Sequence, residues 1–239
     1  MDFLITAFNT ILYRPLFNAL VLLYEYLPGK DFGAAIIVLT ALIRILLFPF
    51  GRKALKSQKA LSELQPKVKE IQEKFKDDKE KQTKEIMELY KREKINPFSG
   101  CLPLLIQFPI LIALYRVFWR GLQKEQLVFL YGFVSAPEII NSMFFGLIDL
   151  SQPNIVLAIL AGVFQFIQTK MLTPKTKKNS AGGAGFSDAM QKQMQYLFPI
   201  LTVIILLRLP SALGLYWLAT TLFTIAQQYF LFKRKPIQT

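Results

Sequence analysis

One apolar stretch with a single charge constrains this chain more than any other feature. Residues Phe32 to Phe50 read FGAAIIVLTALIRILLFPF, and Arg44 is their only charged residue. A run of this length crosses a bilayer as a helix at about 1.5 Å per residue, which puts Arg44 about 9 Å inside its C-terminal end. Lipid penalises such a charge by about 2.5–3.5 kcal/mol on the mildest scale, so Arg44 is a functional candidate. The alternative is an arginine that snorkels to the head groups.

The composition is that of a membrane protein without catalytic machinery. The 239 residues are 53% hydrophobic with a mean hydropathy of +0.35, which is typical of a multi-span protein. The net charge of +13 first indicates topology, and it also suits contact with anionic lipid or RNA. The absence of His and the single Cys101 exclude a structural zinc site, an intramolecular disulfide and His-based catalysis. We therefore expect no enzyme activity, metal or cofactor.

Basic residues gather in alternate loops and so predict the topology. After the first span at 30–50, the remaining four spans lie within residues 96–232, at Phe98–Trp119, Ile155–Leu172, Gln195–Leu207 and Leu213–Phe232. Basic segments at 51–95, 174–187 and 233–239 belong in the cytoplasm, and the loop at 120–152, which is poor in Lys and Arg, belongs outside. The pattern predicts an all-α protein with five transmembrane helices, an outer N-terminus and a cytoplasmic C-terminus.

Residues 1–29 are predicted to form an amphipathic helix that lies in the membrane interface. Arg14-Pro15, Asn18 and Glu25 interrupt their apolar character, and no basic residues precede the apolar part as they would in a signal peptide. A sixth span is the alternative. Three tyrosines suit an interfacial position: Tyr13, Tyr24 and Tyr26.

Residues 51–95 are predicted to form a cytoplasmic helical hairpin with a coiled-coil seam. Apolar residues recur at alternating steps of three and four at Leu61, Leu64, Val68, Ile71 and Phe75. Asp77-Asp78 would make the turn and cap the second helix, whose apolar face continues at Ile86, Leu89 and Tyr90. Pro66 is expected to kink the first helix.

Polar side chains form stripes on four of the predicted spans. Thr40 shares a face with Arg44, and the second span carries Gln107. Further stripes comprise Gln165, Gln168 and Thr169 on the third span, and Trp217, Thr220, Thr221, Thr224 and Gln228 on the fifth. Any one of these side chains is explained by interhelical hydrogen bonding, worth about 0.6 kcal/mol per contact. Together with an arginine that has no acidic partner in the apolar stretches, they favour a water-containing cavity.

Four sequence blocks resemble the YidC-type membrane protein insertases, which have relatives in mitochondria and chloroplasts. They are ELQPKVKEIQEKF (63–75), MELYKREKINPFSGCLPLLIQFPILIALY (87–115), GVFQFIQTKM (162–171) and PSALGLYWLATTLFTIAQQ (210–228). The resemblance covers about residues 30–232 in the same order. The chain departs from many family members in showing neither a large extracytoplasmic domain nor a lipoprotein signal, and its basic tail is short.

The resemblance implies a five-span core around a hydrophilic groove that is closed to the outside and open to the cytoplasm and to lipid. By position, the groove would contain Arg44, Thr40, Gln107, one of Gln165 and Gln168, and the aromatic pair Tyr216 and Trp217. Thr220 and Thr224 extend the same stripe.

The expected function is to guide nascent membrane proteins into the lipid bilayer of the bacterial plasma membrane, as insertase and chaperone, alone or with the Sec translocon. Arg44 would attract an acidic tail, since two charges 4 Å apart interact by about 4 kcal/mol at an effective dielectric of about 20. Expected partners are substrates, ribosome, translocon and lipid, with no specific nucleic-acid sequence. The rivals are a small anion transporter or channel, for which broken helices and coupling acids are missing, and a scaffold with a snorkelling arginine.

Overall fold

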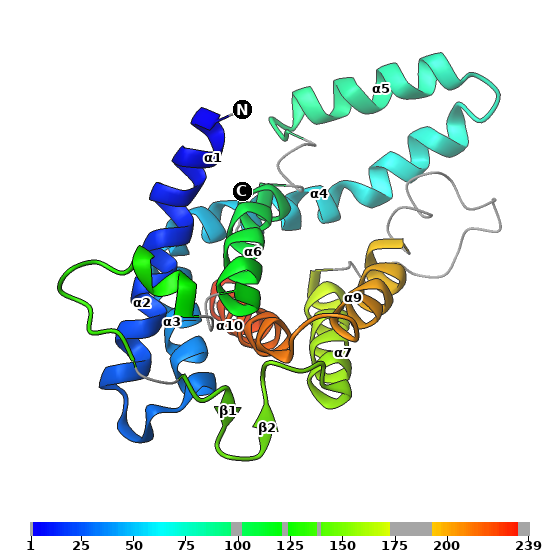
Figure 1. The fold of residues 1–239 in the computed structure, drawn as a ribbon. Helices are drawn as coiled ribbons and strands as arrows, with labels where there is room; N and C mark the ends of the chain where they lie inside the picture. The colour runs from blue at the N-terminus through cyan, green and yellow to red at the C-terminus, as the bar shows by residue number, and fades with distance from the viewer. Residues whose placement is uncertain (1, 97–101, 121–123, 138–139, 173–192, 234–239) are drawn as a thin grey trace.

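The protein is almost entirely helical in the parts that its computed structural model describes, residues 2–96, 102–120, 124–137, 140–172 and 193–233 (Figure 1). The loop predicted at 174–187 and the tail after Lys233 lie outside these residues. In chain order the elements are α1 Asp2–Phe8, the π-turn η1 Asn9–Tyr13, α2 Arg14–Tyr26, η2 Pro28–Lys30, α3 Phe32–Leu46, α4 Phe48–Lys74, α5 Lys79–Arg92, α6 Leu102–Arg120, η4 Lys124–Phe129, β1 Met143–Phe144, β2 Ile148–Asp149, α7 Ile155–Leu172, η5 Gln193–Leu197, α9 Phe198–Leu206 and α10 Ser211–Lys233.

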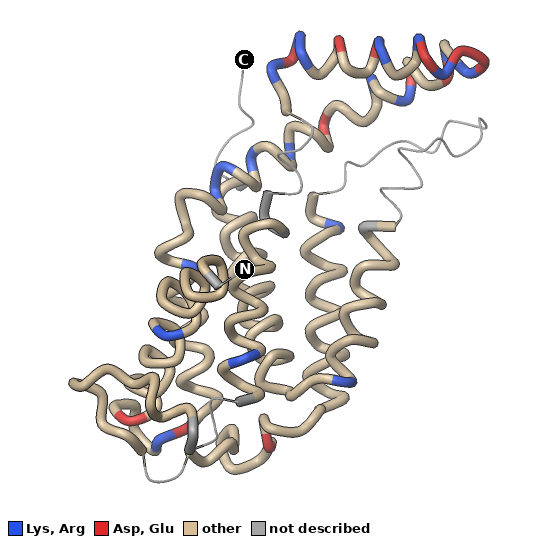
Figure 2. The backbone as a smooth tube through the Cα atoms, turned by 45° about the horizontal axis from the view of Figure 1, so that its top comes forward, with Lys and Arg blue, Asp and Glu red and all other residues tan. Residues whose placement is uncertain are grey.

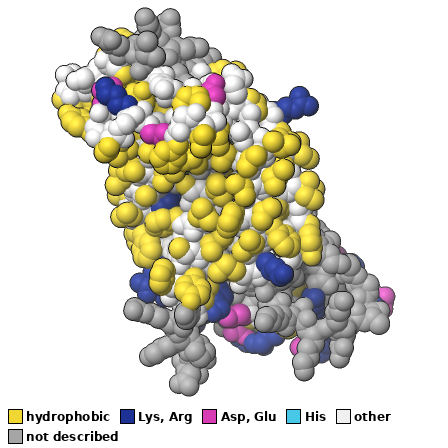
Figure 3. Space-filling model, turned by 90° about the horizontal axis from the view of Figure 1, so that it is seen from below, with side chains coloured by type: hydrophobic (Ala, Val, Ile, Leu, Met, Phe, Trp, Pro, Cys, Tyr) yellow, Lys and Arg dark blue, Asp and Glu magenta, His cyan; other side chains and the backbone are white. Residues whose placement is uncertain are grey.

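Several helices are apolar enough for a membrane. In the described residues, Phe3–Tyr26 and Ile155–Leu172 are each long and apolar enough to cross one, and the bent pair of α3 and α4 is a third if it is counted as one span. Leu105–Trp119 and Gln195–Leu206 are shorter apolar helices. Figure 3 shows a broad hydrophobic surface between two more polar ends, as a bilayer requires.

The helix predicted to run from Phe32 through Phe50 is broken. α3 ends at Leu46, α4 begins at Phe48, and the two are bent by 71°. Pro49 explains the break, because proline lacks the N–H that an uninterrupted helix would use and its ring clashes with the preceding turn. Pro66, at which a kink was predicted, lies inside α4, which is continuous from Phe48 to Lys74. The chain therefore changes direction at Leu47, where the hairpin of α4 and α5 begins.

α10 lies at the centre of the bundle and packs against α3, α6, α7 and α9. Its early residues Leu213 and Tyr216 are 1% and 2% exposed, and they share one core with Ile36 of α3, Leu114 of α6 and Ala161 of α7. The elements far apart in the sequence thus meet around α10. A stripe on α10 can therefore face several helices at once.

Residues 2–26 form one helix, here called the N-terminal helix, with a π-turn at Asn9–Tyr13. Figure 1 shows it from the side while α10 is seen nearly along its axis, so the two are steeply inclined to each other. Its polar side chains bind the loop after α6: Arg14 Nε donates to the Phe129 carbonyl at 3.0 Å, and Asn18 Oδ1 accepts from the Tyr131 amide at 2.7 Å. The polar interruptions in this helix therefore hold a loop in place.

A short β-hairpin closes the end of the bundle opposite α4 and α5. β1 and β2 pair antiparallel, with Phe144 opposite Ile148. Asp31 caps α3 by accepting from the Ala34 amide at 2.7 Å, and its other oxygen accepts from the Phe145 amide. The Ala212 amide at the start of α10 donates to the Leu150 carbonyl at 3.0 Å. The β-hairpin thus joins the beginnings of α3 and α10.

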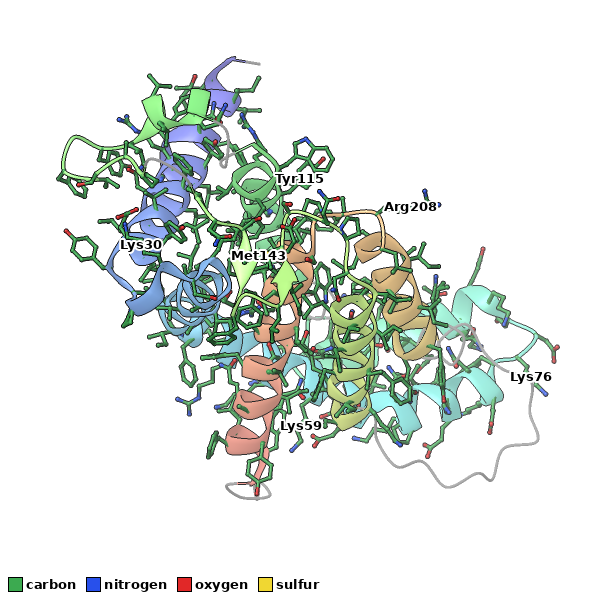
Figure 4. The ribbon with its side chains drawn as sticks, turned by 60° about the horizontal axis from the view of Figure 1, so that its bottom comes forward. Lys30, Lys59, Lys76, Tyr115, Met143 and Arg208 are labelled. Atoms are coloured by element: carbon green, nitrogen blue, oxygen red, sulfur yellow. The ribbon has the colours of Figure 1, made fainter. Side chains whose placement is uncertain are left out.

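α4 and α5 form the predicted antiparallel hairpin, which projects beyond the bundle and carries most of the charge (Figure 2). Leu64, Val68 and Leu89 of these two helices are buried. Asp78 caps α5, as predicted, by accepting from the Lys81 amide at 2.9 Å. Lys67 Nζ lies 2.7 Å from Glu93 Oε1, and this hydrogen bond holds the pKa of Glu93 below its usual value. Lys76 marks the tip, far from the bundle, in Figure 4.

Candidate functional site

Arg44 reaches across the bundle and joins a chain of hydrogen bonds. It lies on α3 one turn before the break at Leu47, and its Nη2 atom donates to Gln107 Oε1 of α6 at 2.9 Å. Gln107 Nε2 in turn donates to the Tyr216 hydroxyl of α10 at 2.5 Å. Three helices therefore contribute one side chain each to a polar chain that ends at the guanidinium.

Arg44 has no acidic partner among the described residues. The ion pairs within the described residues join Lys30 to Glu25, Lys59 to Glu63 and Lys67 to Glu93, and none of them involves Arg44. Its partner Gln107 is a neutral amide, and Tyr216 beyond it is a phenol. A half-buried cation with neutral neighbours remains able to attract an anion.

A second pair lies one residue further along α10. Trp217 Nε1 donates to Gln165 Oε1 of α7 at 3.1 Å, and Gln165 is only 5% exposed. Gln168, one turn further along α7, is half-buried. Of the two glutamines that the sequence left open, the structure brings Gln165 against the aromatic pair.

Two of the three predicted threonines, Thr40 and Thr224, donate hydrogen bonds to backbone carbonyls of their own helices. Thr40 Oγ1 donates to the Ile36 carbonyl at 2.6 Å, and Thr224 Oγ1 donates to the Thr220 carbonyl at 2.9 Å. The Thr220 hydroxyl oxygen is buried within the stripe. These short side chains make α10 and α3 polar along one face without joining the helices to one another.

Sequence reasoning missed a second arginine inside the bundle. Arg116 of α6 donates from Nη1 to Asn9 Oδ1 at 2.8 Å, and its guanidinium carbon lies 4.9 Å from the Tyr13 ring centroid. Asn9 and Tyr13 bound the π-turn of the N-terminal helix. The sequence did contain a signal for this contact, because Arg116 is a charged residue within the second predicted span. The residues that it contacts belong to the N-terminal segment, which was expected to lie apart from the core. The hydrogen bond to Asn9 and the contact with the Tyr13 ring indicate that Arg116 holds the N-terminal helix against α6.

Comparison with known proteins identifies relatives across nearly the whole chain. A family model described as 60Kd inner membrane protein matches residues 22–238. Three relatives named membrane protein insertase YidC come from Fusobacterium nucleatum (38% identical over 205 residues), Wolinella succinogenes (37% over 227) and Pelobacter propionicus (35% over 226). The alignments cover 85%, 95% and 94% of this chain.

The relatives differ in how much of their own length is matched. The alignment covers 87% of the Fusobacterium protein, but only 38% and 39% of the Wolinella and Pelobacter proteins, so the chain spans well under half of those two. Their shared name describes insertion into a membrane and no chemical conversion, in agreement with the prediction that this chain is not an enzyme. By the extent of these matches and its apolar helices, the chain belongs to the 60Kd inner membrane protein family and is a multi-pass protein of the bacterial inner membrane.

Proposed function

We propose that this protein inserts nascent membrane proteins into the lipid bilayer by means of a cationic groove around Arg44. The observation that carries the proposal is the chain from Arg44 through Gln107 to Tyr216, in which neutral groups hold an arginine that has no acidic partner among the described residues. A permanent acidic partner would neutralise the site. Neutral partners orient the guanidinium and leave its charge for a substrate.

The groove lies among five membrane-spanning helices, α3, α6, α7, the helix formed by η5 and α9, and α10. It is lined by Arg44, Thr40, Gln107, Gln165, Tyr216, Trp217, Thr220 and Thr224, with Gln168 at its edge. The hydrogen bonds from Gln107 to Tyr216 and from Trp217 to Gln165 support this set, because they bring the predicted residues of α6, α7 and α10 together. The N-terminal helix lies in the outer interface beside α6.

The mechanism needs no nucleotide or metal. A nascent protein must move a polar, often acidic, tail across hydrocarbon, and a hydrated groove that reaches part of the way shortens that barrier. Arg44 attracts the carboxylates of the tail while the apolar segment of the substrate moves into lipid beside the bundle. Burial of that segment in hydrocarbon, at about 25 cal/mol per Å², supplies the free energy.

The basic hairpin of α4 and α5 faces the cytoplasm and meets substrates before they enter the groove. The same hairpin provides the contact surface for the ribosome and the Sec translocon. Its exposed Lys and Arg residues and its projection beyond the bundle support this role (Figure 2). The N-terminus is then outside and the C-terminus in the cytoplasm.

The test is a charge comparison in proteoliposomes or in cells depleted of their own insertase. Insertion of a substrate with an acidic tail is measured beside that of the same substrate with a neutral tail. Arg44→Ala is expected to reduce insertion of the acidic substrate at least about tenfold, which corresponds to 1.4 kcal/mol, and Arg44→Lys to preserve most of it. Arg208→Ala is the matched control, because Arg208 is exposed at the far end of α9 (Figure 4). Equal loss for both substrates would contradict the proposal.

A further inference from the structure

Gln228 of α10 has a fully enclosed side chain whose amide has no hydrogen-bond partner among the described residues. Its exposed fraction is 0%, and within the described part of the chain neither Nε2 nor Oε1 makes a hydrogen bond. An unsatisfied buried amide costs about 1–3 kcal/mol, so such groups in native proteins normally bind either protein or ordered water. Because the described residues supply no such bond, ordered water is the candidate partner of Gln228.

Gln227 and Gln228 form a second polar level on α10. They lie eleven residues after Tyr216 and Trp217, which is about three turns or about 16 Å along the helix. The side chain of Gln227 therefore lies on the same face of α10 as that of Tyr216, and the side chain of Gln228 on the same face as that of Trp217. The second level is closer to the hairpin of α4 and α5, and it is separated from the Arg44 chain by the threonines of the stripe.

The beginning of α4 covers this second level. We call residues 48–62 the α4 cover. Gln227 Nε2 donates to the Phe48 carbonyl at 3.3 Å, and Lys59 Nζ lies 4.5 Å from the Phe232 ring centroid. The Ser62 hydroxyl donates to the Leu172 carbonyl at the end of α7. The cover thus lies across the ends of α10 and α7, with Lys59 between them in Figure 4.

Close contact between the α4 cover and α10 depends on Gly51. A Cβ atom at this position would lie 3.3 Å from Gln227 Oε1 and 3.4 Å from its Nε2. Ala54 and Leu55, the next residues of the cover that face the bundle, are only 3% and 4% exposed. A larger residue at 51 would therefore push the cover away from the two glutamines.

We propose that Gln228 binds water in a closed polar compartment beneath the α4 cover, and that the cover controls exchange of this water with the aqueous phase on the hairpin side. The amide offers both a donor and an acceptor, which suits a small ligand that can do the same. Thr224 lies one turn before Gln228 on α10. Its hydroxyl donates to the Thr220 carbonyl, so the oxygen can still accept a hydrogen bond from the water. Thr224 also lines the proposed groove, but the inference does not rest on the proposed function, because neither the buried amide of Gln228 nor the contacts of the α4 cover involve Arg44.

Thiol accessibility tests the control by the cover. In a Cys101→Ser background, Gln228→Cys is treated with a membrane-impermeant cationic methanethiosulfonate from the hairpin side. The reaction is expected to be slow, and to become at least about tenfold faster when Gly51→Leu or Gln227→Leu is added. Lys56→Leu, an exposed position of the same helix, is the control and should leave the rate unchanged. A thiol at Thr221, two turns away, should stay unreactive throughout. Equal rates at position 228 with and without the Gly51 and Gln227 substitutions, whether slow or fast, would overturn the control by the cover.

An experimental structure that resolves ordered water tests the site itself without any substitution. We expect water within about 3.2 Å of Gln228 Nε2 or Oε1. A dry compartment, or an amide bonded directly to protein atoms, would overturn the assignment of a water site.

Discussion

Arg44 Nη2 lies 2.9 Å from Gln107 Oε1, so the arginine of α3 is held by a neutral side chain of α6. Gln107 uses its other amide atom for Tyr216 of α10 and thereby orients both neighbours. This one amide connects the charge of the site to the packing of the bundle. Its replacement should separate the electrostatic role of the site from its structural role.

Gln107→Glu should abolish the attraction for acidic tails while keeping the fold. The new carboxylate would stand where the amide oxygen now accepts from Arg44, and the Tyr216 hydroxyl can turn to donate to it. Insertion of an acidic-tailed substrate should fall at least about tenfold, and thermal stability should change little. Gln107→Leu should instead lower the free energy of unfolding by about 1–3 kcal/mol, because Arg44 and Tyr216 lose their partner. Full insertion by the Gln107→Glu variant would contradict the charge mechanism.

Gln165→Leu and Gln168→Leu should differ in stability. Gln165 accepts the hydrogen bond from the half-buried Trp217, so its loss leaves the indole N–H without this partner at a cost of about 1 kcal/mol. Gln168→Leu should change the free energy of unfolding by less than about 0.5 kcal/mol. Denaturation of the purified protein in mild detergent measures both. A larger effect at Gln168 would reverse the assignment.

Gly33→Ala should disturb the contact between the β-hairpin and α3. A Cβ atom on Gly33 would lie 2.0 Å from Phe144 Cδ2, so the Phe144 ring would have to move. Faster hydrogen exchange at the Phe145 amide, which donates to Asp31, should report that movement. Gly132→Ala is the matched control, because nothing lies within 4 Å of the corresponding Cβ. Identical exchange in both variants would show that the ring is not fixed by α3.

Acid should loosen the loop after the β-hairpin by protonating Asp149. Hydrogen bonds from Ser142 and then from Ser151 hold the pKa of Asp149 below its usual value. Because the pKa is lowered in the folded protein, its contribution to stability is complete above the unfolded value of about 3.9 and is lost as pH falls through the folded value. The protection of the Ser151 amide, which is the intrinsic exchange rate divided by the observed rate at each pH, should therefore fall at the acid end between pH 5 and about pH 2. Asp149→Asn should remove this pH dependence, and its persistence would assign it to another group.

Local patterns in the sequence determined the elements of this protein. The cap at Asp78 and an apolar helix at Ile155–Leu172 appear as predicted, and Leu64 and Val68 of the predicted seam are buried. Each depends on residues within a few turns of one another, where helical periodicity alone decides which side chains share a face. The lone charge of Arg44 was equally visible, because it needs only the composition of one stretch.

Only the tertiary structure decided how the helices meet. The sequence could not choose between Gln165 and Gln168, since both lie on similar faces of α7 and the partner depends on the depth and rotation of α10. The pairing of Arg44 with Gln107, separated by 63 positions, and the contact of Arg116 with Asn9 depend in the same way on helices distant in sequence. The break at Leu47 combines both kinds of cause. Pro49 is a local reason for the helix to end there, whereas the direction of α4 after the break depends on its contacts with α10 and α7.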